Sequence, residues 1–293
     1  MSRIEEINEN FDLAVSYFSH AEEMFYQFPK YELSSPSAKM NYESFLTTLN
    51  KTNPKEIKTY YKSSFGNTTG YALGRMYELL GGGVPTSDFA ELLYMCAVSN
   101  GEDPFECNYV EINGQKLLLF DRLDVYDSIP CIGHEASHHL QDKYCTLYNG
   151  YHCEILSMLI ELILADEISK PNIDSTIYYK NITKTINALK KLQAYASSIT
   201  SYNKEARIPE LRVKIEYIKE HREQMAYTYT VSFIYAYNLF LEYKKNPNKL
   251  LNELEMMFMN NSSIDRVIEN YNLDFSNKET FEGPNKVLKS LSK

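Results

Sequence analysis

Ser128-Ile-Pro-Cys-Ile-Gly-His-Glu-Ala-Ser-His-His-Leu140 is the stretch of this 293-residue chain that decides which fold we expect. Its apolar residues recur every three or four positions, which is the spacing of one face of an α-helix: Ile129, Ile132, Ala136 and Leu140. Ser128 and Pro130 fit the first turn of such a helix, because serine caps helix starts and proline is tolerated at the first helical position. The sequence therefore predicts an amphipathic helix that begins near residue 128.

Two histidines and a glutamate lie in the same stretch. Residues four apart share a face of an α-helix, so the imidazoles of His134 and His138 can reach one metal ion. Glu135 would then lie beside the metal without binding it, where a carboxylate can accept a proton from the water that the metal activates. The pattern His-Glu-x-x-His on a helix is typical of zinc hydrolases. We expect one zinc ion per chain, although the same ligands also accept manganese or cobalt.

A catalytic zinc ion with two histidine ligands needs a third protein ligand, most often histidine, aspartate or glutamate. Glu154 opens an apolar run that continues to Ala165 and predicts a largely buried helix, antiparallel to the first. A carboxylate inside such a run costs free energy unless a metal or a cation pairs with it, so we expect Glu154 to be the third ligand. Glu161 lies two turns further on the same face, and is the alternative ligand or the partner that orients a ligand histidine.

The remaining sequence predicts helices around one small sheet. Residues 109–120 predict a β-hairpin beside the metal helix, with Asn113-Gly114 as its two-residue turn. Helical periodicity is found over residues 4–25, 37–50, 54–63, 69–80, 87–98, 174–201, 209–245 and 247–259. We expect a mainly α fold with an N-terminal helical region over 1–100 and a zinc-binding catalytic domain over 101–293, joined in one compact unit.

Charge and cysteine content limit the partners and the compartment. The net charge is -9 and the pI is near 5.3, which argues against nucleic acid and against anionic membranes. No segment is apolar and long enough to span a membrane or to direct export. Five cysteines, an odd number without paired metal spacing, predict reduced thiols and a cytoplasmic protein. The sequence does not indicate an oligomeric state.

These elements together resemble the M3 family of zinc metallopeptidases, which includes thimet oligopeptidase and oligoendopeptidase F. In that family the His-Glu-x-x-His helix is followed by a helix of the form Glu-x-x-Ser-x-x-x-Glu, which stands here as Glu154 to Glu161 with Ser157 between them. The first of those glutamates is the family's third zinc ligand, so the resemblance also implies that Glu154 binds zinc. The likeness covers about residues 100 to 285.

A second part of the likeness is a tyrosine-rich segment, residues 227–247, which resembles a helix of the same family. The resemblance implies that Tyr229, or else Tyr227, faces the zinc and donates a hydrogen bond to the carbonyl oxygen of the scissile bond. A phenol suits that role because it stays protonated at neutral pH and can donate to developing negative charge. The resemblance also implies that His221 corresponds to a family histidine that assists the tyrosines.

The chain departs from the family at two positions and in length. Ser137 stands where the family usually has glycine, Gln141 stands where it commonly has histidine, and family members are roughly twice as long. We expect a helical metallopeptidase reduced to its catalytic core: a zinc-dependent, oligopeptidase-like metalloendopeptidase that acts on peptides or unfolded polypeptides. Two alternatives are a dedicated processing protease for one protein or precursor peptide, and a non-catalytic helical binding protein with a vestigial metal site.

Overall fold

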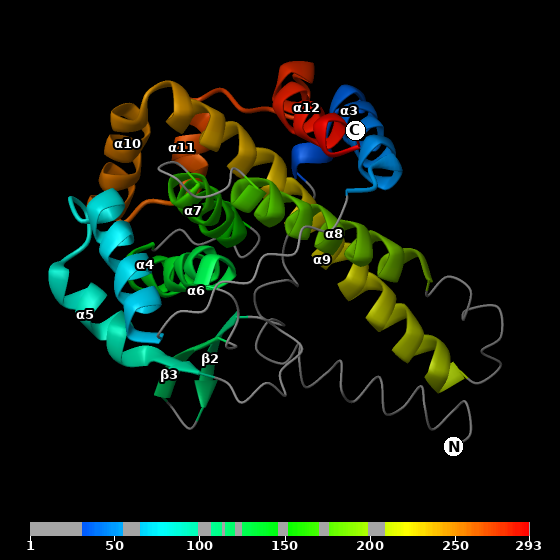
Figure 1. Ribbon diagram of the computed structural model, residues 1–293. Helices are drawn as coiled ribbons and strands as arrows, with labels where there is room; N and C mark the ends of the chain where they lie inside the picture. Colours follow the sequence, from blue (N-terminus) through cyan, green and yellow to red (C-terminus); the bar gives the residue numbers. More distant parts are fainter. Residues whose placement is uncertain are drawn as a thin grey trace.

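A computed structural model describes residues 31–54, 65–98, 107–112, 115–120, 125–145, 152–169, 176–198 and 209–292. Within those residues the protein is mainly α, with ten α-helices around one three-stranded sheet (Figure 1). The expected helix over 4–25, and most of the one over 54–63, lie outside the described residues. None of the helices in the described ranges is long and apolar enough to cross a bilayer.

Four helices form the middle of the molecule: α6 (Val125–Tyr144), α7 (Cys153–Ile168), α8 (Thr176–Ser198) and α9 (Pro209–Lys245). On one side of α6 lie two helices, α4 (Phe65–Leu80) and α5 (Thr86–Met95), and the sheet formed by β1 (Cys96–Val98), β2 (Cys107–Ile112) and β3 (Gln115–Phe120). Four of the remaining elements contact α8 or α9: α3 (Pro36–Lys51), α10 (Pro247–Met259), η3 (Lys278–Phe281) and α12 (Glu282–Leu291). The short η1 (Tyr31–Leu33) packs on α3, and α11 (Ile264–Asn270) packs on α10 and α7.

The predicted helices over 37–50, 69–80, 174–201, 209–245 and 247–259 are confirmed as α3, α4, α8, α9 and α10. The predicted start of the metal helix is wrong, because α6 begins at Val125 and contains Pro130. Proline inside a helix leaves the carbonyl four residues earlier without its backbone donor, which is why the sequence pattern favoured a start at this position. The sequence predicts no helix for α11 or α12.

The hairpin is confirmed, with β2 and β3 antiparallel and Ile112 opposite Gln115; its turn, Asn113-Gly114, lies outside the described residues. The predicted helix over 87–98 is too long. It ends at Met95, and β1 then pairs in parallel with β3, so that the strand order is β1-β3-β2. A three-residue apolar segment has no periodicity that distinguishes strand from helix, and only its distant partner β3 decides the outcome.

The buried apolar residues form one cluster to which helices from both sides of residue 100 contribute, among them Phe45 on α3, Met76 on α4 and Leu159 on α7. Helix α7 lies at its centre and is buried around most of its circumference. A helix that is apolar on nearly all sides can be stable in water only when other helices surround it. Here α6, α8 and α9 all contact α7.

Helices α6 and α7 are in close contact at Gly133. A Cβ atom at this position would overlap a methyl group of Leu164 and lie 3.2 Å from Ile160 Cγ2. Leu164 and Ile160 are fully buried, so they have little room to move aside. The absence of a side chain at Gly133 therefore sets the distance between the two helices.

Asp88 connects α5 to α6. Its side chain is 5% exposed and accepts hydrogen bonds from Lys143 Nζ at 2.6 Å and from the Tyr144 hydroxyl. Burial alone would raise the pKa of Asp88, but the bonds from Lys143 and Tyr144 outweigh it and lower the pKa below 3.8. The charged carboxylate therefore stabilises the fold above the unfolded-state value of 3.8, and this contribution is lost as the pH falls through the lowered pKa.

We expect Gly133→Ala to lower the free energy of unfolding by about 1–3 kcal/mol, because the added methyl group overpacks the contact between α6 and α7. Gly74→Ala is the matched control. A Cβ at Gly74 in α4 meets nothing within 4 Å, so alanine should raise stability by up to about 1 kcal/mol through its better helix propensity. Urea unfolding monitored by circular dichroism measures both, and equal stability of the two variants would contradict the packing account.

We expect Asp88→Asn to lower the free energy of unfolding by about 1.5–3 kcal/mol near neutral pH, because it replaces a buried charged acceptor. The deficit should shrink below pH 3.8, where the wild-type carboxyl also becomes protonated on unfolding. Glu91→Gln removes an exposed partner of the same lysine and should cost less than about 1 kcal/mol. Urea unfolding across the acidic range tests this, and a deficit that does not change with pH would contradict it.

Candidate metal centre

The candidate site lies where α6 and α7 pack side by side. His138 Nδ1 lies 3.3 Å from Ser157 Oγ, and His134 Nδ1 lies 3.0 Å from Glu161 Oε2. The earlier residue of α6 thus meets the later residue of α7, so the two helices run antiparallel, as the sequence predicts. Side chains one turn apart on α6 therefore face side chains one turn apart on α7, and several polar side chains lie in one row between the helices.

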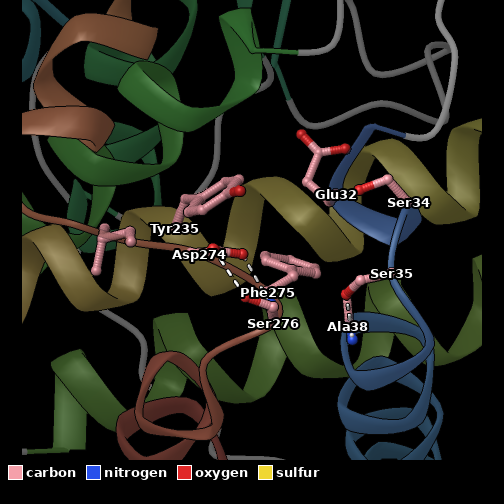
Figure 2. Close-up of a pocket in the computed structure, with 9 residues that line it drawn as sticks. Glu32, Ser34, Ser35, Ala38, Tyr235, Asp274, Phe275 and Ser276 are labelled. Atoms are coloured by element: carbon pink, nitrogen blue, oxygen red, sulfur yellow. Dashed lines mark hydrogen bonds between the residues drawn. The ribbon is translucent and has the colours of Figure 1, made fainter.

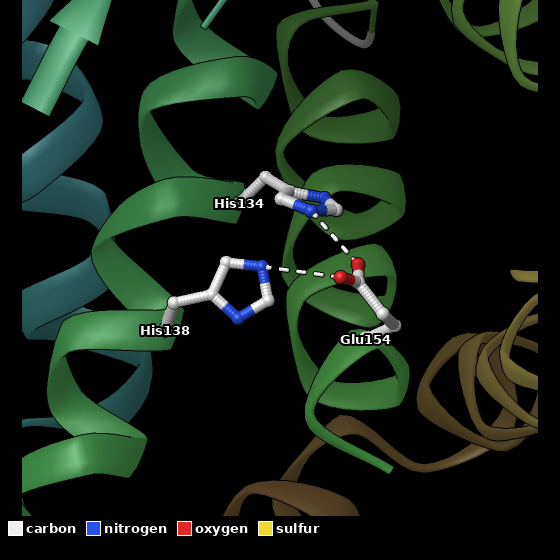
Figure 3. A group of neighbouring side chains, drawn as sticks. All are labelled: His134, His138 and Glu154. Atoms are coloured by element: carbon white, nitrogen blue, oxygen red, sulfur yellow. Dashed lines mark ion pairs between the residues drawn. The ribbon is translucent and has the colours of Figure 1, made fainter. Parts of the chain in front are cut away.

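Three side chains in this row converge on one point (Figure 3). Glu154 Oε2 lies 3.2 Å from His134 Nε2, and Glu154 Oε1 lies 3.7 Å from His138 Nε2. One ligand atom from each residue lies within 4.8 Å of the other two. Donors that bind a tetrahedral ion at about 2.0–2.1 Å stand roughly 3.3 Å apart. The spacing of His134, His138 and Glu154 therefore suits a single metal ion.

Two further observations fit a metal at this point. Glu154 Oε2 is buried and has no well-aligned hydrogen bond, so its charge is compensated by the nearby ring of His134, a place that a bound cation could take over. The side chains of His134 and His138 are 13% and 15% exposed, so one side of the group can be reached from solvent. Among the described residues this is the one such group of three histidine, cysteine or acidic side chains. Three protein ligands with an accessible side are typical of catalytic rather than structural metal sites.

The structure distinguishes the two candidate glutamates. Glu161 contacts Nδ1 of His134, the nitrogen that faces away from Glu154, and it also accepts a hydrogen bond of 2.8 Å from Asn181 Nδ2 on α8. A carboxylate in this place orients the imidazole and makes the other ring nitrogen a better donor to a metal. Ser157 is placed in the same way at Nδ1 of His138. The geometry thus places Glu154 with the ligands and Glu161 behind them.

The pKa values of the two histidines in this group are shifted in opposite directions. Burial opposes charge on both, but hydrogen bonds to Glu154 and Glu161 raise the pKa of His134 well above its usual value. Burial lowers the pKa of His138 to about 4, although Glu154 opposes this. Burial would also raise the pKa of Glu154, but His138 and a hydrogen bond from His134 outweigh it and lower the pKa to about 2. Two carboxylates and one protonated imidazole leave a negative site that can exchange a proton for a divalent cation.

Tyr229 and Glu135 lie at this group. The hydroxyl of Tyr229, on α9, hydrogen-bonds Glu154. The negative charge of Glu154, then burial and the charge of Glu135, raise the pKa of Tyr229 well above its usual value, so the phenol keeps its proton. The charge of Glu135 also acts on His134. Both residues named from the sequence for chemistry are therefore next to the candidate ligands.

Tyr227 is not brought to the group in this way. Residues two apart on a helix point in nearly opposite directions, and the Tyr227 hydroxyl donates to Glu32 Oε2 at 2.6 Å instead. This contact disfavours Tyr227 as the catalytic tyrosine. His221 lies in α9, but its side chain is outside the part of the chain that the structure describes.

The two departures from the family pattern have structural roles. Ser137 is fully buried and donates a hydrogen bond of 2.7 Å to the carbonyl of Gly133, one turn earlier. Gln141 Nε2 donates at 3.0 Å to the carbonyl of Cys153, at the start of α7. Gln141 therefore joins the end of α6 to the beginning of α7, close to Glu154. Neither substitution removes a group from the candidate ligand set.

Comparisons of the chain with protein-family models, with the curated proteins and with the solved structures give no match. The likeness to the M3 metallopeptidases is therefore a likeness of short sequence motifs. The distances between the side chains of α6 and α7 do not depend on that likeness.

Substituting the two glutamates separately tests their roles. Glu154→Ala should abolish stoichiometric zinc binding, because two histidines alone leave the ion one protein ligand short. Glu161→Ala should keep the site but weaken zinc binding by about 10–100-fold, since only the orientation of His134 is lost. Zinc content by mass spectrometry and competition with a fluorescent chelator measure both. Zinc retained in Glu154→Ala but lost in Glu161→Ala would exchange the two assignments.

Proposed function

We propose that this chain is a zinc-dependent metalloendopeptidase of the M3-like, oligopeptidase type. The observation that carries the proposal is the convergence of His134, His138 and Glu154, with Glu135 and Tyr229 beside them. A structural metal site has no need of the last two residues and normally has a fourth protein ligand. The helical framework and the order of the elements in the chain are compatible with such an enzyme.

The proposed chemistry divides between the metal and the side chains. A zinc ion held by His134, His138 and Glu154 would polarise the peptide carbonyl and make water acidic enough to be deprotonated near neutral pH. Glu135 would accept that proton and return it to the leaving amine. Glu135 suits this exchange because it directly follows His134 on α6 and its charge acts on both His134 and Tyr229.

Tyr229 is the proposed donor to the carbonyl oxygen. Its raised pKa keeps the phenol protonated, and a neutral donor is required where negative charge develops. With a metal at Glu154, the hydroxyl could exchange its hydrogen bond with that carboxylate for one with the substrate. Stabilisation of such an oxyanion by one well-placed donor is worth about 10²–10³ in rate.

The sheet offers a place for an extended peptide. Strand β2 is at one edge of the sheet and packs against α6, the helix that carries His134 and His138. An edge strand presents unpaired backbone groups, so a peptide chain can bind along it through main-chain hydrogen bonds. Recognition of this kind depends little on side chains, which favours peptides as the class of substrate.

We expect zinc-loaded protein to cleave members of a quenched fluorescent peptide library, and Glu135→Gln to abolish turnover by several orders of magnitude while retaining one zinc per chain. Glu43→Gln on the exposed face of α3 is the matched control and should leave activity unchanged. Chelation should stop cleavage, and added zinc should restore it. Full activity in Glu135→Gln would sink the proposal, and no cleavage of any peptide by zinc-loaded wild type would favour a non-catalytic or strictly dedicated protein.

A further inference from the structure

A cavity of about 390 Å³ lies apart from the candidate metal centre, between η1, α9 and the segment that precedes η3 (Figure 2). Glu32 and Ser34 line it from one side, Tyr235 from α9, and Asp274 and Ser276 from the other side. This volume is at the lower end of the range for sites that hold small organic molecules. Nothing in the proposed peptidase chemistry uses it.

The charge around this cavity is one-sided. Among the described residues that line it, the charged ones are Glu32 and Asp274, and both are acidic. Behind the lining, Glu32 pairs with His152 at 3.1 Å, and His152 pairs in turn with Asp265. Two carboxylates share that single imidazole, so the chain of three groups stays net negative whether or not His152 is protonated. The cavity therefore favours a cation.

Tyr235 supplies an independent indication of a ligand. The residue is 5% exposed, and its hydroxyl has no hydrogen-bond partner within the described ranges. Figure 2 shows this hydroxyl pointing into the space between Glu32 and Asp274. Burial and the charges of Glu32, Asp274 and Asp265 raise its pKa, so it is a neutral phenol. A phenol hydroxyl that faces a cavity and has no partner among the described side chains can bind a ligand there.

The acceptors in the cavity have capacity to spare. Asp274 accepts from the backbone N–H and the hydroxyl of Ser276, at 2.7 and 2.8 Å, which uses one lone pair on each carboxylate oxygen. Each oxygen can accept once more. The oxygens of Glu32, Asp274 and Tyr235 surround one space. A ligand group with several N–H donors would complement them.

Part of the cavity lining is apolar, which favours an organic cation over a bare metal ion. Phe275 is 1% exposed and its ring lies 5.0 Å from that of Tyr235, while Ala38 and Leu273 complete the apolar lining. In the part of the chain that the structure describes, the carboxylates here do not form a group close enough to hold a metal. A ligand with a charged end and a short apolar stem would use both kinds of surface.

We propose that this cavity binds a primary ammonium group carried on a short apolar or aromatic stem, with Asp274 and Tyr235 as its direct acceptors. Such a group occurs both on free amines and at the N-terminus of a peptide, and the chemistry of recognition is the same for each. The site does not depend on the proposed peptidase activity, so either assignment can fail without the other.

Isothermal titration calorimetry on the full chain with phenethylamine tests the proposal, with 2-phenylethanol as its uncharged counterpart. We expect one phenethylamine per chain and at least tenfold weaker binding of the alcohol. Asp274→Asn should weaken phenethylamine at least tenfold, and Tyr235→Phe at least threefold. Tyr271→Phe is the matched control, because it removes a buried hydroxyl without a partner outside the cavity and should leave binding unchanged. Circular dichroism and thermal unfolding verify that each variant is folded.

A second pair of ligands separates the two sources of the ammonium group. Binding of the peptide Phe-Gly-Gly, but not of its N-acetyl form, would assign the site to peptide N-termini; binding of phenethylamine alone would assign it to free amines. Either result supports the proposal. It is overturned if wild type fails to bind any of these amines at millimolar concentration, if amine and alcohol bind equally, or if folded Asp274→Asn and Tyr235→Phe both bind like wild type.

Discussion

The structure depends on two carboxylates that lie within α7, a helix that is buried on nearly all sides. Glu154 and Glu161 belong to α7, which is otherwise enclosed by apolar contacts with α6, α8 and α9. Buried carboxylates are tolerated only where donors or cations compensate the lost hydration. Each neighbouring helix supplies such a group: His134 from α6, Asn181 from α8 and Tyr229 from α9. The helices that pack against the apolar surface of α7 therefore also supply the polar groups that contact its two carboxylates.

Helix α9 connects this arrangement with the rest of the molecule through its tyrosines. Tyr229 points to Glu154, whereas Tyr227 donates to Glu32 and packs edge-on against Tyr42. Tyr235, two turns further along, faces the acidic cavity. The high tyrosine content is thus explained in part by one long helix that meets different polar surroundings on different faces. Each phenol combines a large apolar ring with a single hydrogen-bonding group, which suits such boundaries.

Local patterns in the sequence were sufficient for much of the fold and of the candidate site. His134, His138 and Glu154 could be chosen because helical spacing and the cost of a buried carboxylate are local arguments, and most helices have clear periodicity. Features that depend on contacts between residues far apart in the chain could not be predicted from local patterns. Asn181 has no signal of its own, and β1 becomes a strand only through β3. The Glu32 contact that removes Tyr227 from the metal group joins residues 195 positions apart.

The short distance in the chain between the three candidate ligands has a consequence for the order of assembly. His134, His138 and Glu154 all lie on one antiparallel pair of helices, while Tyr229 arrives from a helix 75 residues further on. Contacts between near neighbours in sequence form at a lower entropic cost than distant ones. If the group binds zinc as we propose, the helical pair would be able to capture the ion before α9 docks, and metal binding would then stabilise the two helices that α9 packs against.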